Sequence, residues 1–401
     1  MVKCIFCDNN LTDDTKPEHI LLNALGGRKT TTRVDCSACN GKFGSTIDDE
    51  VGKQVAVMRN MLQLDSGTGR APPMLRNLQS GDDIINLRND GTPELIAKPF
   101  TARKLEDGSF ELQLKTESIE EAARYIPHIA AQIGCSEEQV LEMLKSSSGS
   151  FTERRPDTVH HAIGLGGPLA VRSAAKSALV LWATLTGNDE IKSPPYDDVR
   201  RFIVAGDEAF NRARAYLDSR YLPHSDEFQR RFGTFFNLIY VRSDESGRVI
   251  AHFTLYNIIS WQIVLVEAGG TPNARIGLVS NPLDPRDWSD TIADEIDIDF
   301  AWLDSPDYTD EFVRARERFE AAVRHHFEIQ RPRELNRIAV DVFEKHGIVN
   351  ENEPITDPEL LNKIIGEMSR RFASHALGFP HMEDLTGEEI VARLRAVRSD
   401  R

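Results

Sequence analysis

Three mainly apolar runs in the middle of the chain predict the strands of a buried sheet. They cover residues 235–241, 249–255 and 259–266, and they are rich in β-branched and aromatic side chains. Ser246 and Gly247 mark a turn between the first two runs, so we expect these strands to be antiparallel.

Apolar residues at helical spacing predict helices on both sides of these strands. The strongest pattern covers residues 169–186, and others cover 45–64 and 119–133. Phenylalanines recur at helical spacing from residue 312 onwards, which predicts a helical C-terminal third. Alternation around Asp107 and Gly108 predicts a further hairpin. Together these patterns indicate an α+β fold with an antiparallel sheet and several helices.

The composition is typical of a globular chain. Of the 401 residues, 40% are hydrophobic and 28% are charged, which excludes a disordered or fibrous protein. No apolar run reaches the roughly 18–20 residues of a membrane span. The N-terminus lacks the apolar stretch of a secretory signal, so we expect a cytoplasmic protein in a reducing compartment.

The net charge of −15 argues against a protein that coats nucleic acid without specificity. The charge is uneven, however. The first 60 residues hold as many basic as acidic residues, which leaves room for a local basic site. The segment from Asp284 to Glu311 is strongly acidic, and we expect it to form a solvated face or loop.

Four of the five cysteines lie in the first tenth of the chain, as two CxxC pairs. A CxxC turn brings two thiolates close enough to share a zinc ion, and two such turns complete a tetrahedral site. In a reducing compartment, metal binding is a commoner use of such pairs than a redox role. We therefore predict a structural zinc site made by Cys4, Cys7, Cys36 and Cys39.

The segment between the two cysteine pairs carries side chains suited to chemistry. Glu18 and His19 are expected at the end of a short strand, and Asn40 is expected at the start of a helix. These three can converge across a small ββα unit, which needs the zinc because so few residues cannot bury a core unaided. A basic loop lies between them and contains Arg28, Lys29 and Arg33.

Residues 4–50 read CxxC, Glu-His-Ile, Gly-Gly and CxxC-Asn, followed by Phe-Gly and Ile-Asp. This segment resembles the zinc-stapled branch of the HNH (ββα-metal) endonucleases. The resemblance implies a metal-dependent enzyme that hydrolyses phosphodiester bonds in DNA, with His19 as general base. It also implies that Glu18 and Asn40 hold a catalytic Mg²⁺ or Mn²⁺ ion. The basic residues Arg28, Lys29, Arg33 and Lys42 would contact phosphates.

The sequence departs from the family at one position. Many HNH nucleases carry an asparagine about five residues before the second cysteine pair, where this chain has Thr31. A hydroxyl cannot span two backbone groups as an amide can. A noncatalytic, zinc-bound nucleic-acid adaptor therefore stays an alternative. Asn40 could also serve only as a helix cap.

The chain divides at a Gly-, Ser- and Pro-rich linker over residues 65–75. We expect an HNH nuclease module at 1–64 and a mixed α+β region at 76–401, with a further division near 310 into a helical C-terminal part. The larger region would select substrate or regulate activity, and an effector activated by a small nucleotide is a second alternative. Because one HNH unit cuts one strand, a homodimer is the simple route to double-strand breaks. A bacterial defence or restriction role fits this architecture by analogy.

One further pair of basic residues stands out on the predicted helix 169–186. Arg172 and Lys176 are four residues apart, so they share one face of that helix. We expect this face to meet solvent or a phosphate.

Overall fold

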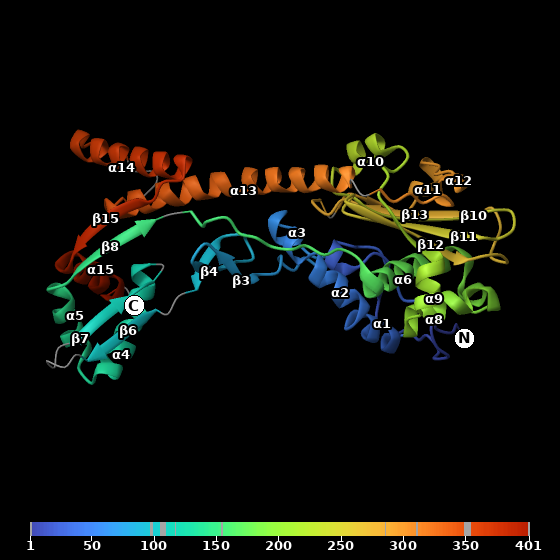
Figure 1. The fold of residues 1–401 in the computed structure, drawn as a ribbon, viewed down its shortest axis with the longest axis horizontal. Coiled ribbons are helices and arrows are strands. Elements are labelled where there is room, and N and C mark those ends of the chain that lie inside the picture. The colour runs from blue at the N-terminus through green and yellow to red at the C-terminus, as the bar shows by residue number, and fades with distance from the viewer. Residues whose placement is uncertain are drawn as a thin grey trace. The chain divides into compact units, whose positions relative to one another are not determined.

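The computed structural model describes residues 2–96, 99–104, 110–116, 118–153, 155–284, 286–309, 312–348 and 354–399. The chain forms two compact units. The first combines Met1–Pro73 with Ala162–Phe327, and the second combines Met74–His161 with Glu328–Arg401. Both units mix helices with antiparallel strands (Figure 1), so the predicted α+β class is confirmed.

A six-stranded antiparallel sheet forms the centre of the first unit, with strand order β14-β13-β10-β11-β12-β9. The three runs predicted from the sequence are β10 (Asn237–Ser243), β11 (Val249–Leu255) and β12 (Ile259–Val266). Their antiparallel pairing is confirmed, and Gly247 adopts the left-handed conformation in the turn between β10 and β11, with φ 77°. The outer strands are β9 (Ala215–Asp218), β13 (Arg275–Ser280) and β14 (Trp288–Ser289).

Helix α6 (Gly167–Thr186) covers one face of this sheet and confirms the predicted helix. Alanines and serines line its buried side, which lets the helix approach the strands closely. At its far end, Trp182 is fully buried and donates a hydrogen bond of 2.8 Å to the hydroxyl of Tyr196. The neighbouring helices are α7 (Asn188–Ile191), α8 (Asp197–Ala205) and α9 (Glu208–Arg214).

The opposite face of the sheet carries a second apolar cluster that includes Phe228, Phe236, Leu238, Tyr240 and Ile296. Acidic residues of the segment 284–309 are mainly exposed, so the expected solvated acidic face is confirmed, and some of them also bind arginines beside this face of the sheet. Arg242 Nη1 lies 2.6 Å from Asp297 Oδ1, for example. The covering helices are α10 (Ser225–Phe232), α11 (Ile292–Glu295) and α12 (Phe300–Leu303).

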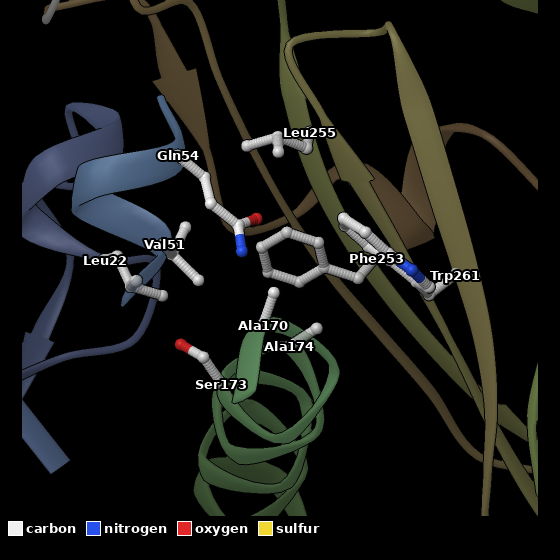
Figure 2. Close-up of a pocket in the computed structure, with 9 residues that line it drawn as sticks. All are labelled: Leu22, Val51, Gln54, Ala170, Ser173, Ala174, Phe253, Leu255 and Trp261. Atoms are coloured by element: carbon white, nitrogen blue, oxygen red, sulfur yellow. The ribbon is translucent and has the colours of Figure 1, made fainter. Parts of the chain in front are cut away.

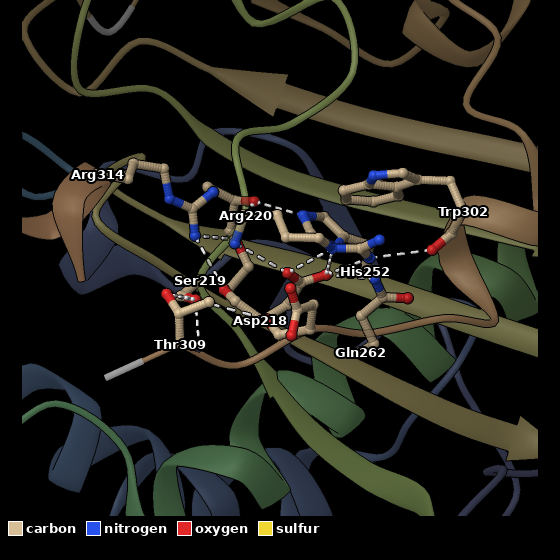
Figure 3. Close-up of polar contacts among 11 residues, drawn as sticks. Asp218, Ser219, Arg220, His252, Gln262, Trp302, Thr309 and Arg314 are labelled. Carbon is tan, nitrogen blue, oxygen red and sulfur yellow. Dashed lines mark hydrogen bonds and ion pairs between the residues drawn. The ribbon is translucent and has the colours of Figure 1, made fainter. Parts of the chain in front are cut away.

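A buried polar network lies on the same face at the end of β9 (Figure 3). Asp218 is fully buried, and its carboxylate accepts hydrogen bonds from Arg220 at 2.7 Å and from Gln262 at 2.5 Å. The Arg220 guanidinium stacks on the Trp302 ring at 4.1 Å. Arg314, in the first turn of α13 (Val313–Lys345), donates to the backbone oxygen of Asp218. The network therefore attaches α12 and the start of α13 to the sheet.

The N-terminal segment shares one apolar core with α6 and the sheet, through residues such as Leu21, Phe43 and Val51. It comprises β1 (Glu18–His19), the single turn η1 (Asn23–Leu25), β2 (Thr30–Thr31) and three short helices. The domain boundary expected at residue 64 stays a prediction. The three helices are α1 (Ser37–Gly44), α2 (Ile47–Gln54) and α3 (Ala56–Met61).

The helical stretch predicted from about Ser45 to Leu64 is confirmed as α2 and α3, with a break of one residue at Val55. Helix α1 precedes this stretch and ends where the chain turns at Ser45 and Thr46. Both hydroxyls donate to the backbone oxygen of Lys42, at 3.2 and 2.7 Å. Such local side-chain bonds compete with a continuing helix. This turn separates α1 from α2.

The second unit holds three small antiparallel sheets, with orders β3-β4-β5, β6-β7 and β15-β8. Strands β6 and β7 pair as the sequence suggested, while Asp107 and Gly108 lie outside the described residues. The boundary expected near 310 stays a prediction, since residues 310 and 311 are also outside them. The strands are β3 (Leu75–Ser80), β4 (Asp83–Leu87), β5 (Pro93–Ile96), β6 (Phe100–Lys104), β7 (Phe110–Leu114), β8 (Ser148–Glu153) and β15 (His381–Thr386).

Helices of the second unit pack around a small core that includes Ile126, Ile129, Val140, Leu141 and Leu394. Helix α13 starts in the first unit and ends in the second. None of the described helices is long and apolar enough to cross a membrane. The helices of this core are α4 (Ile119–Ile133), α5 (Glu137–Lys145) and α15 (Gly387–Ser399), and the unit also contains α14 (Pro358–Leu377).

Candidate active site

The four N-terminal cysteines converge at one point of the first unit. Their Sγ atoms all lie within 4.8 Å of one another, and the Sγ atoms of Cys7 and Cys36 are 3.6 Å apart. Four thiolates bound to one zinc ion at about 2.3 Å lie roughly 3.8 Å apart. The cluster is therefore compatible with zinc. Within the described part of the chain, no other group of three or more His, Cys, Asp and Glu side chains is arranged to hold a metal.

Polar contacts favour the thiolate form at part of the cysteine cluster. The backbone N–H of Phe6 donates to Cys4 Sγ at 3.4 Å, and the Asn9 amide donates to Cys36 Sγ at 3.6 Å. A hydrogen bond from the Cys39 thiol lowers the pKa of Cys4 to about 5. The same bond raises the pKa of Cys39, and burial raises the pKa of Cys7. Negative sulfur atoms are the ligands that zinc requires. The donor set and its surroundings therefore fit the predicted structural ion.

Strand pairing places Glu18 and His19 on opposite sides of a short hairpin. Glu18 pairs with Thr31, and His19 pairs with Thr30. Because successive residues of a strand point to opposite faces, one side chain faces inward and the other outward. Glu18 is only 4% exposed, whereas His19 is half-buried.

Two glycines make the turn between these strands possible. Gly26 has φ 84°, a conformation that favours glycine. A Cβ atom on Gly27 would lie 1.9 Å from the backbone oxygen of Leu21, closer than any real contact. The Gly-Gly pair noted in the sequence is thus required by the hairpin itself.

Asn40 lies beside this hairpin. Its Nδ2 donates a hydrogen bond of 3.1 Å to the backbone oxygen of Pro17, the residue before Glu18. Helix α1 starts after Cys36, so Asn40 lies within the helix and the interpretation as a cap is wrong. The structure therefore places Asn40 beside the start of β1, while the side chains of Glu18 and His19 point to opposite faces of that strand.

A buried lysine from α6 binds the inward-facing side of the hairpin. Lys176 is 1% exposed, and its ammonium donates to the Glu18 carboxylate and, at 2.6 Å, to Asp48 Oδ2. Ser173, about one turn earlier on α6, donates to the other oxygen of Asp48 at 2.5 Å. We call Glu18, Asp48 and Lys176 the Lys176 cluster. The expectation that Lys176 meets solvent or a phosphate is wrong.

Arg172, the other member of that pair, is half-buried and binds the backbone. Its guanidinium donates to the backbone oxygen of Ile203 at 2.8 and 3.2 Å.

Close to the Lys176 cluster, the N-terminal segment meets α6 and the sheet around a cavity of about 10 Å³ (Figure 2). Such a volume holds at most one water molecule. Ser173 lies at its edge. The junction is thus tightly packed and offers no room for a ligand. Its walls are formed by Leu22, Val51, Gln54, Ala170, Ser173, Ala174, Phe253, Leu255 and Trp261.

The basic residues predicted to contact phosphates differ in their surroundings. Arg28, Arg33 and Lys42 are exposed. Lys29 is half-buried, and its ammonium lies 2.6 Å from Asp290 Oδ2. Arg28 and Arg33 flank β2, the strand that pairs with Glu18 and His19.

These residues gather a cysteine cluster, a Glu-His hairpin and an asparagine-bearing helix in one small segment. Residues 4–56 match the family model of the HNH endonucleases. The resemblance seen in the sequence is thereby confirmed for this stretch, which we call the HNH segment, and the match supports a nuclease of the HNH type. Such a nuclease acts on nucleic acid. No curated protein and no solved structure matches the chain significantly.

Burial lowers the pKa of His19 in the HNH segment, and the positive charges of Lys176 and Arg28 lower it further. The imidazole is therefore neutral near pH 7, which is the form that accepts a proton.

Buried titratable groups lie beneath the hairpin. Burial raises the pKa of Glu18, and Asp48 adds to this, although Lys176 opposes both. Burial alone would lower the pKa of Lys176, but Asp48 and Glu18 raise it above its usual value. Asp35 is also fully buried, and neither of its carboxylate oxygens has a hydrogen-bond partner. Burial, with the negative charge of Glu18, raises the pKa of Asp35 to about 8, so this carboxyl is mainly protonated near pH 7.

The residues expected to hold a catalytic divalent ion fit such an ion in their chemistry. Glu18 binds Lys176 through Oε1, so its Oε2 atom is left as a possible metal ligand. Asn40 binds Pro17 through Nδ2, so its Oδ1 atom is left for the same purpose. Carboxylate and amide oxygens are the ligands that Mg²⁺ and Mn²⁺ prefer.

Sequence reasoning missed Asp48 and Lys176 as members of the site. Asp48 belongs to the Ile-Asp pair of the family pattern, which could have drawn attention to it. No local signal distinguishes Lys176, because its partners lie 128 and 158 residues away in the chain.

Proposed function

We propose that the HNH segment hydrolyses phosphodiester bonds in DNA. The observation that carries this proposal is the placement of His19, which is half-buried, neutral near pH 7 and two residues from Pro17, whose backbone oxygen Asn40 binds. In this proposal the imidazole takes a proton from a water molecule, which then attacks the phosphorus. General-base catalysis of this kind contributes about 10²–10⁴-fold to the rate.

Glu18 and Asn40 would hold one Mg²⁺ or Mn²⁺ ion beside the scissile phosphate, and Cys4, Cys7, Cys36 and Cys39 would hold a structural zinc ion. The divalent ion, when bound, would supply positive charge to the leaving oxygen. Arg28 and Arg33 are exposed next to the hairpin and would contact neighbouring phosphates, as would Lys42. Lys29 could do so only after leaving Asp290.

The protein would work in the cytoplasm, as a homodimer where both strands are cut. A role in bacterial defence or restriction rests on the combination of a small nuclease with a larger second part. Activation by a small nucleotide that binds the larger part remains an alternative to constitutive activity.

Cleavage of plasmid DNA with Mg²⁺ or Mn²⁺ tests this proposal, with the full chain compared with Asn40→Ala. We expect nicking by the native chain and a large loss in the variant, because the variant lacks one oxygen ligand. Equal nicking by both proteins would contradict the role of Asn40. No nicking by either protein, with or without added nucleotides, would favour the noncatalytic adaptor.

A further inference from the structure

We propose that Lys176 and Asp48 are positioning residues for His19, so that α6 contributes to the geometry of the nuclease site. This inference rests on the proposed function. It identifies a buried contact, the Lys176 cluster, as the device that holds the hairpin of the HNH segment in the orientation that exposes His19.

The Lys176 cluster connects distant parts of the chain through buried charges. Lys176 lies in the middle of α6, Asp48 lies in the first turn of α2, and Glu18 lies in β1. The side chains of Lys176 and Glu18 are 1% and 5% exposed. Asp48 is 17% exposed and is bound at both oxygens from α6, by Lys176 and Ser173. Two elements of the HNH segment are thus bound to one side of one helix.

The hairpin itself is too short to fix which side chain faces outward. Only two residue pairs join β1 to β2. A shift of the strand by one residue would turn His19 inward and Glu18 outward. The bond from Lys176 to Glu18 opposes that shift, because it holds the Glu18 carboxylate on the inner face. With Glu18 held inside, strand alternation places His19 on the outer face.

Charge explains why Lys176 in particular is needed. Its ammonium is the positive group that contacts both carboxylates of the cluster. Without it, two negative groups would face each other beneath the hairpin, and Glu18 would be drawn towards water. Such a movement would take His19 with it, since the two residues are adjacent.

The test compares full-length Lys176→Met, Lys176→Arg and Asp48→Asn with the native chain. The matched control is Lys53→Met, since Lys53 pairs with Asp49 of the same helix α2 at 2.8 Å on the exposed surface. Cleavage of plasmid DNA gives kcat and KM separately. Hydrogen exchange at the backbone N–H of Ile20, which donates to Lys29 O across the hairpin, gives a readout that needs no cleavage.

We expect Lys176→Met to lower kcat by about 100-fold with KM changed less than about threefold, since a small misplacement of a catalytic group costs this much. Asp48→Asn should lower kcat by about tenfold, and Lys176→Arg should keep more of kcat than the methionine variant. Exchange at Ile20 should accelerate in Lys176→Met and stay unchanged in Lys53→Met. Should Lys176→Met fail to fold, Asp48→Asn carries the test, since it leaves Lys176 in the core but removes the carboxylate charge of Asp48 that helps to hold its ammonium in place.

Native kcat and native exchange at Ile20 in both Lys176→Met and Asp48→Asn would overturn the inference. A loss of stability without a change in kcat would also overturn it, because the cluster would then be structural only. These results are distinct from a failure of the proposed function, which would appear as a native chain that cuts no DNA. In that case the exchange at Ile20 still decides whether the Lys176 cluster holds the hairpin.

Discussion

Lys29 and Asp290 form an ion pair of 2.6 Å between the basic loop of the HNH segment and the acidic segment that follows β13. The Lys29 ammonium also lies 5.9 Å from the centre of the Trp288 ring. Asp290 carries a negative charge as a phosphate does, so under the proposed function it would compete with DNA for Lys29.

Asp290→Asn should therefore strengthen DNA binding by freeing Lys29. One additional phosphate contact makes the plot of log affinity against log salt steeper by about 0.9, so the gain is largest at low salt. Asp294→Asn is the matched control, since Asp294 is an exposed acid of the same segment that forms no ion pair with another described residue. Fluorescence anisotropy with a labelled duplex measures both variants. An equal change in the two would show that only the overall charge matters.

Zinc content should depend on the four clustered cysteines and not on the fifth. We expect one zinc ion per chain in the native protein, and its loss together with a lower melting temperature in Cys36→Ser or Cys39→Ser. Cys135→Ser is the control, because Cys135 lies outside the cluster. Elemental analysis of the purified proteins provides the measurement. Zinc retained in Cys36→Ser would be inconsistent with a four-thiolate site.

The two cysteine pairs and the strands β10, β11 and β12 could be predicted because their signals are local. Spacing alone brings Cys4 near Cys7, and continuous apolar runs identify buried strands. Helix ends were harder to predict, since the stretch from 45 to 64 is interrupted at Val55 without a local signal. At the end of α1, the hydroxyls of Ser45 and Thr46 bind the backbone oxygen of Lys42 and so compete with a continuing helix.

The neighbours of the candidate site could not be predicted from sequence patterns. Lys176 looks like an ordinary helix-surface residue until the fold places it beside Glu18 and Asp48. Asp290 belongs to a segment whose composition indicated only solvation. Both residues act through contacts with residues more than one hundred positions away in the chain. The spacing of neighbouring residues therefore does not reveal these contacts.

Gly27→Ala should disrupt the hairpin, because the new Cβ would lie 1.9 Å from the backbone oxygen of Leu21. Overpacking of this kind costs about 1–3 kcal/mol of the free energy of unfolding. Gly41→Ala is the control, since Gly41 lies within α1 and a Cβ there meets nothing within 4 Å. Thermal unfolding of both variants compares them. A melting temperature of Gly27→Ala equal to that of the control would argue against the described turn.

Asp218→Asn should weaken the first unit in a pH-dependent manner. Burial alone would raise the pKa of Asp218, but its hydrogen bonds from Arg220 and Gln262 leave it below the usual value. A lowered pKa in the folded state adds stability above the unfolded pKa of about 3.9, and that stability is lost as the pH falls through the folded pKa. Removing the charge leaves Arg220 without its carboxylate, which costs about 3 kcal/mol at pH 7.

Urea unfolding at pH 7, 5 and 3 measures this difference. The gap between the native chain and Asp218→Asn should be full at pH 7 and 5 and smaller at pH 3. Asp284→Asn is the control, because Asp284 pairs with Arg286 on the exposed surface and should change little. A gap that is independent of pH would contradict the charged state of Asp218.

The most direct test of the central claim is the single-turnover rate of DNA cleavage at pH 7 by the full chain and by His19→Ala, with His160→Ala as an exposed-histidine control. The account predicts a native rate for His160→Ala and a rate about 10²–10⁴-fold lower for His19→Ala, with zinc content unchanged. A His19→Ala protein that cuts DNA at the native rate would contradict the assignment of His19 as the general base.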